Sequence, residues 1–326
     1  MILVTGGAGF IGSNIVASLN DAGRTDIAIS DTLGKDGKWR NLQKRQLADF
    51  VPPHELMRWL DGRKLDAVIH MGAISETTAR DGDAVMDNNF RLSLALLDWC
   101  TNTKTPFIYA SSAATYGNGG EGFTDDWRLP ALKKLRPMNL YGWSKHLFDL
   151  ALVDRASKGQ KLPPQWAGLK FFNVFGPNEY HKGEMMSLVA KRFEDARAGQ
   201  PVVLFKSPRD GIADGDQRRD FIYVEDAVAV VRWLMDTPKV SGIFNVGTGK
   251  ARSFKDLISA MFAALGRAPD IQYIAMPETI RDSYQYFTES SVDNLRRAGY
   301  NAGFTSVEDG VMRYVDAFLD QPDRYR

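Results

Sequence analysis

A tyrosine and a lysine stand four residues apart in the segment Tyr141-Gly142-Trp143-Ser144-Lys145. In a helix this spacing places the phenol and the ammonium one turn apart on the same face. Tyrosine titrates at about 10, and a neighbouring cation that lowered this pKa by about 3 units would stabilise the phenolate by about 4 kcal/mol. Such a pair could take a proton from a substrate oxygen and return it. The spacing also arises readily by chance, so its meaning depends on the residues that accompany it.

A glycine-rich turn near the start of the chain is the first of these companions. Gly6, Gly9 and Gly12 follow a short apolar run and open an amphipathic stretch. Glycines leave room for a pyrophosphate to approach the backbone at a helix N-terminus. Asp31 follows about 20 residues on, at the end of the second expected strand, which is typical of dinucleotide-binding units. The alternative is a purely structural turn, but the context favours dinucleotide binding.

The residues after Asp31 leave the choice between NAD and NADP open. Asp31 itself would accept hydrogen bonds from the adenosine ribose, which favours NAD. Lys35, Lys38 and Arg40 follow at once. They could neutralise the 2′-phosphate of NADP, or they could form a solvated basic loop.

Short β-branched runs alternate with amphipathic stretches through the first half of the chain. The expected strands are residues 2–4, 27–30, 67–70, 107–111 and 169–172, and the expected helices are 11–22, 54–60, 85–102 and 138–157. This alternation predicts a parallel sheet with crossover helices on both faces. We therefore expect an α/β fold, a doubly wound parallel (Rossmann) sheet with a second, smaller and mostly helical substrate domain.

The pattern changes after Gly176, where a stretch rich in Gly, Pro, Asn and His is followed by a helix and a polar loop from Ser207 to Arg218. An apolar strand at Ile243–Val246 is expected to rejoin the sheet. The expected domains are a dinucleotide-binding domain of residues 1–173 and 220–248 and an interleaved substrate-binding domain of residues 174–219 and 249–326.

The composition is that of an ordinary globular protein. The 326 residues carry 41 Lys+Arg and 40 Asp+Glu, a net charge of +1, which gives no electrostatic case for nucleic acid or an anionic membrane as a partner. No apolar run approaches the roughly 18 residues of a membrane span. The single cysteine, Cys100, excludes an internal disulfide and fits a reducing cytoplasm, and the four histidines lack the spacing of metal ligands. We expect a soluble cytoplasmic protein without a catalytic metal.

Ser112 ends an expected strand, where ligands collect in open parallel sheets. Its hydroxyl could hold a substrate oxygen beside the phenol, or it could simply cap the strand end. In the order Gly6, Ser112, Tyr141 and Lys145, the chain resembles the extended short-chain dehydrogenase/reductase family. The resemblance spans nearly the whole chain, and most extended members transform nucleotide sugars.

Further segments carry the same resemblance. They are Asp49 with its neighbours, Asn88 in Asp87-Asn88-Asn89, residues 172–177 and residues 219–226. The resemblance implies that Asp49 meets the adenine, that Asn88 lines the cofactor channel and that Arg219 reaches the pyrophosphate of a sugar nucleotide.

The residues after Ser112 reduce the number of reaction types that the chain is expected to catalyse. Dehydratases of this family carry an acid directly after the catalytic serine or threonine, whereas Ala113 and Ala114 stand here. Redox chemistry or epimerisation remains. Within the family the chain resembles the ADP-glycero-manno-heptose 6-epimerases, in residues 6–14, 86–89, 109–117, 139–142, 181–183 and 283–288.

This closer resemblance implies inversion at C6″ of ADP-D-glycero-D-manno-heptose, which supplies L-glycero heptose for the lipopolysaccharide inner core. Since no carbonyl adjoins C6″, its hydrogen is not acidic, and it would move as hydride to the nicotinamide and back through a transient 6″-ketone. The C6″ oxygen then needs an acid/base group in each of the two orientations of the substrate. The resemblance assigns these two roles to Tyr141 and Lys182. Lys145 would hold the nicotinamide ribose. The resemblance also implies NADP, with Lys38 near its 2′-phosphate, and a homo-oligomer, a pentamer in that subfamily.

The expected site residues fall into three groups. The catalytic group is Ser112, Tyr141, Lys145 and Lys182. The cofactor-binding group is Gly6, Gly9, Phe10, Ile11, Gly12, Asp31, Thr32, Lys38, Asp49, Met71, Gly72, Ala73, Ile74, Ser75, Asn88, Tyr141, Lys145, Val174 and Lys182. The substrate-binding group is Ser112, Asn173, Glu184, Lys191, Phe205, Lys206, Ser207, Arg219 and Tyr284.

The sequence departs from the subfamily pattern at Glu184, at Lys191, in the longer loop before Arg219, and at Pro53, where a basic residue is expected. These departures concern contacts with the sugar and the adenosine. Two other functions stay open. One is another nucleotide-sugar epimerase, such as a UDP-hexose 4-epimerase, and the other is a non-catalytic protein that senses the cofactor.

Overall fold

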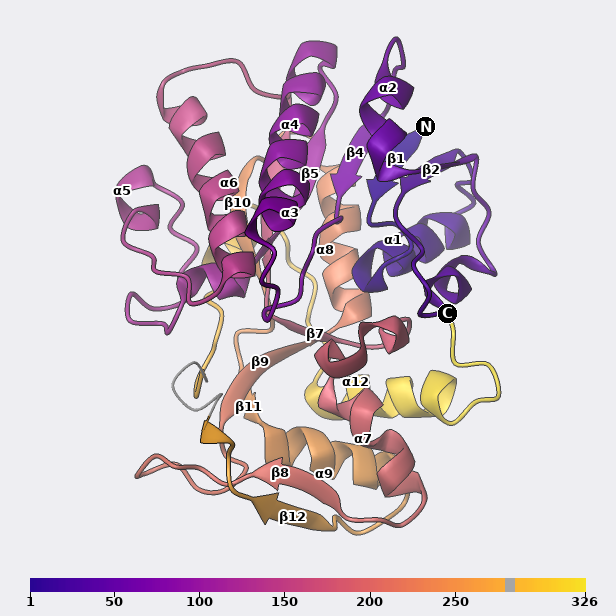
Figure 1. Ribbon diagram of the computed structural model, residues 1–326, viewed down its shortest axis with the longest axis vertical. Helices are drawn as coiled ribbons and strands as arrows, with labels where there is room; N and C mark the ends of the chain where they lie inside the picture. Colours follow the sequence, from indigo (N-terminus) through magenta and orange to yellow (C-terminus); the bar gives the residue numbers. More distant parts are fainter. Residues whose placement is uncertain (279–284) are drawn as a thin grey trace.

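The computed structural model describes residues 1–278 and 285–326, and within this part of the chain a seven-stranded parallel sheet forms one lobe (Figure 1). Its strands follow the order β10-β6-β5-β4-β1-β2-β3. They are β1 (Ile2–Thr5), β2 (Ile27–Ser30), β3 (Asp49–Val51), β4 (Ala67–His70), β5 (Phe107–Ser112), β6 (Trp166–Phe171) and β10 (Gly242–Val246). The predicted doubly wound α/β fold is confirmed, and the strand expected at Ile243–Val246 does rejoin the sheet beside β6.

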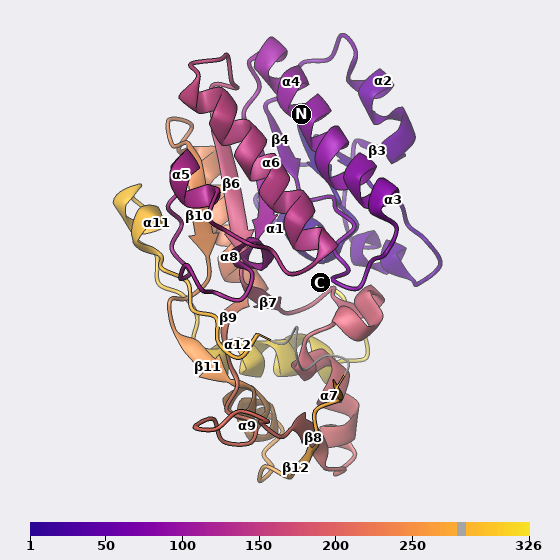
Figure 2. The same ribbon diagram turned by 60° about the vertical axis from the view of Figure 1, so that its left-hand side comes forward.

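Helices cover both faces of this sheet (Figures 1 and 2). The helices α1 (Phe10–Asp21) and α8 (Val224–Asp236) pack on one face, and α4 (Leu92–Thr103) and α6 (Leu140–Ser157) pack on the other. Alternate residues of β1 serve the two cores, because Ile2 and Val4 join the first and Leu3 joins the second. Burial on both sides explains why these strands are continuous apolar runs.

The second lobe lies below the carboxyl ends of the strands (Figure 1). Its helices are α7 (Leu188–Arg197), α9 (Phe254–Ala264) and α12 (Val307–Tyr314), whereas the short helix α11 (Asp293–Arg297) lies beside β10 of the first lobe (Figure 2). It also holds two small sheets. Their strands are β7 (Asn173–Phe175), β9 (Arg218–Tyr223) and β11 (Ala251–Ser253) in one sheet, and β8 (Val202–Phe205) with β12 (Ile271–Ile274) in the other. The domain boundaries expected from the sequence stay a prediction.

Short elements complete the chain. They are the helices α2 (Leu56–Leu60), α3 (Gly82–Met86) and α5 (Leu129–Leu132), and the single turns Lys38–Leu42, Pro53–Glu55, Asp87–Arg91, Ala113–Tyr116, Tyr180–Met185 and Val315–Leu319. None of the helices within residues 1–278 and 285–326 has the length and apolar character needed to cross a bilayer.

The helix expected at Val85–Asn102 is interrupted, and this interruption bears on the site. The chain forms α3, then a π-helical turn over Asp87–Arg91, then α4. Wider turns of this kind are frequent at functional sites because they redirect side chains. Here the turn carries Asn88 and Asn89 toward the loop after β4.

Candidate active site

A cavity of about 1160 Å³ lies where the parallel strands end. Its wall includes the last residues of β1, β2, β5 and β6 and the residues that follow β4. The strand order reverses between β1 and β4, and ligands of open α/β sheets bind at such a reversal, outside the carboxyl ends. The second lobe provides the opposite wall through the turn Tyr180–Met185.

The glycine turn forms one end of the cavity. Gly6 has a φ of 64°, and a Cβ placed on it would lie 2.6 Å from the Gly72 nitrogen. A Cβ on Gly12 would lie 2.1 Å from the Gly6 carbonyl oxygen. Helix α1 begins after Gly9 with neither a side-chain cap nor an acid in its first turn. These features fit a pyrophosphate, because backbone N–H groups stay available and no side chain blocks them.

Asp31 directly follows β2, and both of its carboxylate oxygens accept hydrogen bonds. Its Oδ2 accepts from the Ala8 nitrogen at 2.8 Å, and its Oδ1 accepts from the Thr32 nitrogen at 2.7 Å. The Lys38 ammonium also binds Oδ1, at 2.5 Å. Both side chains line the cavity wall, where Asp31 is buried and Lys38 is partly exposed. A ligand at this corner therefore meets an ion pair whose more exposed member is the Lys38 ammonium.

Tyr141 enters the cavity from the first turn of α6. Asn139 caps this helix by accepting a hydrogen bond from the Gly142 nitrogen at 2.8 Å. Gly142 is needed there because a Cβ would lie 2.7 Å from the Ala114 carbonyl oxygen. Ser112 lines the same wall, and its hydroxyl accepts from the Ala114 nitrogen at 3.1 Å.

The pKa of Tyr141 differs from the one expected beside a cation. Burial raises the pKa of the phenol above its usual value, the hydroxyl of Ser112 opposes this, and the carboxylate of Asp149 adds to it. Lys145 also lines the cavity, one turn along α6, and burial lowers its pKa to about 8 while Asp149 opposes the fall. Burial therefore works against a phenolate at Tyr141, and Lys145 is not among the groups that lower the pKa of the phenol.

His70 lies behind this pair and is a core residue, as its expected strand position suggested. Its Nε2 lies 2.8 Å from the Ser93 hydroxyl, and its Nδ1 lies 2.6 Å from the Thr5 hydroxyl. Since Ser93 donates to the Asn89 carbonyl, it accepts from the ring, which assigns the proton to Nε2. Burial lowers the pKa of His70 to about 3, with a smaller contribution from Lys145, so the ring is neutral.

Lys182 reaches the cavity from the opposite wall. Its ammonium lies 5.2 Å from the centre of the Phe10 ring. Burial lowers the pKa of Lys182, and the carboxylate of Glu179 opposes the fall. Glu179 is buried and fixes the turn by accepting from the backbone nitrogens of Gly176 and Ser187 and from the Ser187 hydroxyl, at 3.3, 2.6 and 2.7 Å.

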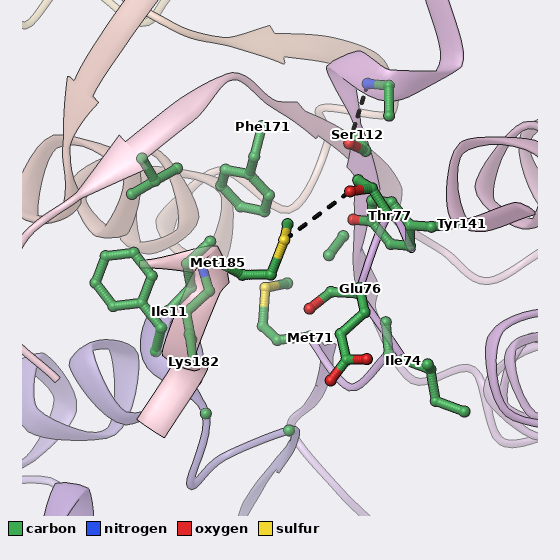
Figure 3. A pocket seen from close by; sticks show the side chains of 18 of the residues that line it. Ile11, Met71, Ile74, Glu76, Thr77, Ser112, Tyr141, Phe171, Lys182 and Met185 are labelled. Carbon is green, nitrogen blue, oxygen red and sulfur yellow. Dashed lines mark hydrogen bonds between the residues drawn. The ribbon is translucent and has the colours of Figure 1, made fainter. Parts of the chain in front are cut away.

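Figure 3 shows Ser112 and Tyr141 on one side of the cavity and Lys182 on the other. Met185 lies between the two sides, and the Thr77 hydroxyl contacts its sulfur at 3.9 Å. This contact joins the loop after β4 to the turn that carries Lys182. The site therefore presents two proton-carrying groups that face a common space from opposite directions.

Asn89 fixes the loop after β4. Its side-chain amide binds both backbone groups of Ile74, at 2.8 and 2.9 Å, and donates to the Ser144 hydroxyl at 3.0 Å. The neighbouring Asn88 donates to the Asn89 side chain and lines the cavity. One π-helical turn thus ties together the loop, helix α6 and the cavity wall.

Arg219 lines the far end of the cavity from β9. Its guanidinium donates to the Arg218 carbonyl at 2.9 Å and lies 5.6 Å from the centre of the Phe254 ring. The next residue, Asp220, is buried and accepts hydrogen bonds from Thr248, Gly249 and Ser290. These bonds hold β9 in place and so fix the position of the arginine.

No group of three or more His, Cys, Asp or Glu side chains suited to a metal ion occurs within the described ranges.

Comparison with known proteins agrees with this architecture. Residues 2–247 match the NAD dependent epimerase/dehydratase family. The chain belongs to this family. Across their full lengths, it is 49% identical to the ADP-L-glycero-D-manno-heptose-6-epimerase of Nitratidesulfovibrio vulgaris strain DP4, with 100% of each covered. The crystal structure of the Helicobacter pylori ADP-L-glycero-D-manno-heptose-6-epimerase is similar with a TM-score of 0.80 and 29% identity, covering 97% of this chain and 95% of that one.

A Thermus thermophilus UDP-glucose 4-epimerase in complex with NAD is also similar, with a TM-score of 0.73, 28% identity and 97% of both chains covered. Membership of the NAD dependent epimerase/dehydratase family gives the chain a nicotinamide dinucleotide as cofactor and confirms the predicted extended dehydrogenase/reductase resemblance.

Most residues expected at this epimerase/dehydratase site lie together on the cavity wall. They are Gly6, Gly9, Phe10, Ile11, Gly12, Asp31, Thr32, Lys38, Met71, Gly72, Ala73, Ile74, Ser75, Asn88, Ser112, Tyr141, Lys145, Asn173, Val174, Lys182 and Arg219. They come from segments spread along the chain from Gly6 to Arg219, so the fold, not local sequence, assembles the site.

Other expected residues lie off this wall. They are Asp49, Glu184, Lys191, Phe205, Lys206 and Ser207. The Asp49 carboxylate accepts from the Trp59 indole at 2.7 Å, and Glu184 pairs with Lys191 at 2.8 Å on the surface. Tyr284 falls outside the described residues. The roles of these residues stay predictions.

The structure places further residues on the wall that were not among the expected site residues. Among them are Glu76, Thr77, Asn139, His181, Met185 and Gln285. Position next to recognised motifs is the signal that could have found some of them. Asn139 precedes Tyr141, and His181 precedes Lys182.

Proposed function

We propose that this protein inverts C6″ of ADP-D-glycero-D-manno-heptose to give ADP-L-glycero-D-manno-heptose, by transient oxidation to the 6″-ketone, for the supply of lipopolysaccharide heptose. The observation that carries the proposal is the placement of Tyr141 and Lys182 on opposite walls of one cavity (Figure 3). The names of the full-length relatives at 49% identity and of the Helicobacter pylori structure support it.

Opposed proton carriers suit inversion at a carbinol carbon. A nicotinamide dinucleotide, held by the glycine turn and Lys145, would supply reversible hydride transfer at C6″. Tyr141, with Ser112 beside it, takes the proton from the substrate hydroxyl in one orientation. When the ketone presents its other face to the nicotinamide, its oxygen points toward the opposite wall. Lys182 gives a proton to the oxygen there as the ketone is reduced, and takes it back in the reverse reaction.

Lys145 has a supporting part in this proposal. It holds the nicotinamide ribose and keeps a positive charge near the phenol of Tyr141. The oxidised nicotinamide is itself cationic, and a cation beside a buried phenol lowers its pKa. A bound oxidised nicotinamide would therefore oppose the rise that burial causes in the pKa of Tyr141. Arg219 and Asn173, from the cavity wall, would bind the sugar nucleotide.

We propose NADP as the cofactor. The Ala8 and Thr32 nitrogens and the Lys38 ammonium already bind the Asp31 carboxylate, which reduces its capacity to accept from ribose hydroxyls. Lys38 offers a cation at the corner where a 2′-phosphate would lie. The lysine ammonium forms a stronger, charge-assisted hydrogen bond with a phosphate than with a neutral hydroxyl.

Replacing Lys38 with Ala is expected to weaken NADP binding about tenfold to hundredfold, since one charge-assisted hydrogen bond is lost. NAD binding should change less than about threefold, because NAD lacks the phosphate. The matched control is Lys35→Ala, in the same loop but exposed and off the cavity wall. Titration of both dinucleotides by calorimetry checks this, and an equal loss for NAD and NADP would contradict the assignment.

The substrate is tested by assaying ADP-D-glycero-D-manno-heptose beside UDP-glucose and UDP-N-acetylglucosamine. The similarity to a UDP-glucose 4-epimerase makes UDP-hexoses the appropriate alternatives. We expect interconversion of the heptose epimers and no turnover of the UDP-hexoses. Turnover of UDP-hexoses alone would overturn the proposal. The homo-oligomer and the cytoplasmic location stay predictions.

A further inference from the structure

A buried pair of opposite charges lies directly behind the Tyr141–Lys145 pair. Asp149 continues the same face of α6 at the next four-residue step, so the phenol, the ammonium and the carboxylate follow one another along one helix face. The partner of Asp149 is Lys170 of β6, whose ammonium lies 3.9 Å from the carboxylate. The side chains of Asp149 and Lys170 are 0% and 1% exposed.

Residues of the strands β5 and β6 hold Asp149 of α6 in place. In the register of β5 and β6, Ser111 lies opposite Lys170, and Tyr109 lies opposite Gly168. The Ser111 and Tyr109 hydroxyls donate to Asp149 at 2.7 and 2.9 Å. A Cβ on Gly168 would lie 2.4 Å from the Tyr109 phenol oxygen, so the absence of a side chain there lets the phenol reach Asp149.

The geometry of the pair is poor for stability alone. Lys170 has no hydrogen-bond acceptor among the residues that the structure describes, and its ammonium lies over the Tyr116 ring at 4.2 Å. Buried ion pairs of this kind seldom stabilise a fold more than apolar side chains of the same size would. A role in the adjoining site accounts better for two charges placed at this point.

We propose that Asp149 is a positioning residue, an anion that keeps Lys145 in its charged form beneath Tyr141, with Lys170 as the counter-charge that keeps Asp149 ionised. This inference rests on the proposed catalytic role of the Tyr141–Lys145 pair. It holds for any sugar nucleotide that the pair oxidises.

The surrounding charges support this direction of effect. Burial pulls the pKa of Lys145 down, and Asp149 is the group that raises it. Burial raises the pKa of Asp149, and Lys170 is the strongest of the groups that lower it. Without Asp149, Lys145 would lose its proton nearer neutral pH.

The other titratable groups around this cluster leave the sign unchanged. His70 faces Lys145 from β4 and His146 faces Lys170 from α6, and burial keeps both neutral by lowering their pKa values to about 3 and about 4. Asp125 faces Lys170 from the loop before α5 and accepts from the Asn245 nitrogen at 3.0 Å. Arg136 acts on His146 and is not among the groups that act on Lys145.

The test is Asp149→Asn in the cofactor-loaded protein, read as the pH titration of the Lys145 side chain. Lysine labelled with carbon-13 at Cε reports the charge by NMR, and Lys145→Met assigns the resonance. We expect the Lys145 midpoint to fall by about one pH unit, because an anion near the ammonium is lost. The alkaline limb of the kcat profile should move to lower pH in parallel.

A matched control and a second variant separate charge from folding. Tyr109→Phe removes one donor to Asp149 but keeps the carboxylate, so its Lys145 midpoint should stay within about 0.3 units of wild type. If Asp149→Asn does not fold because Lys170 is stranded, the charge-neutral double variant Asp149→Asn/Lys170→Met should show a shift of the same sign. An unchanged midpoint in the Asn variants, or an equal shift in Tyr109→Phe, would overturn the inference. Because the titration uses no sugar, a wrong substrate assignment would not affect it.

Discussion

Tyr141→Phe is expected to lower kcat for epimerisation by about 10²–10⁴-fold, the range that a general acid/base contributes. The phenol lines the cavity beside Ser112, and Phe fills nearly the same volume without the proton-carrying oxygen. Dinucleotide binding and KM should therefore change little. Steady-state kinetics with each heptose epimer measure kcat and KM, and calorimetric titration of the cofactor measures dinucleotide binding.

The matched control for this variant is Tyr273→Phe. Tyr273 belongs to β12, off the cavity wall, so the same oxygen is removed from a tyrosine that does not face the site. Its activity should stay within about twofold of wild type, as is usual for substitutions away from special features. Undiminished epimerisation in Tyr141→Phe would remove Tyr141 from the acid/base role.

Lys182→Met should also lower kcat for epimerisation by about 10²–10⁴-fold, because Met keeps an unbranched side chain beside Phe10 but removes the ammonium that carries the proton on the second wall. The sharper expectation concerns the half-reaction. With one base left, each variant should oxidise one heptose epimer but not the other, as seen in the nicotinamide absorbance of a single turnover. Tyr141→Phe and Lys182→Met should retain opposite epimers.

Lys134→Met is the control for Lys182→Met, since Lys134 is exposed and lies off the cavity wall. It should behave as wild type. If Lys182→Met and Tyr141→Phe both retained the same epimer, the two side chains would not serve opposite faces of the ketone, and the two-wall account would be wrong.

The sheet could be predicted from the sequence because its evidence is local. The strands at Ile27–Ser30 and Ala67–His70 have the bounds expected, since parallel strands buried on both faces read as uninterrupted apolar runs. The strand β3 at Asp49–Val51 was missed, because it is three residues long and partly exposed. The strand β11 is also three residues long, and β8 and β12, with four residues each, are partly exposed, so none of the three is an apolar run buried throughout.

The candidate site was predictable where motif and chain order carry it, as at Gly6, Ser112 and Tyr141. Contacts between distant segments were not. The Thr77–Met185 contact and the Asp149–Lys170 pair join residues far apart in the chain. The local sequence around each residue does not indicate which distant residue it will contact. The raised pKa of Tyr141 likewise depends on burial, which the Tyr-Lys spacing alone does not reveal.

The most direct test of transient oxidation is the fate of the hydrogen on the inverted carbon when the reaction is run in heavy water. If C6″ loses and regains its own hydrogen through the bound nicotinamide, the product should carry no solvent deuterium at that position. Protein freed of dinucleotide should be inactive until NADP is restored. Deuterium at C6″ in the product, or full activity without dinucleotide, would contradict the account.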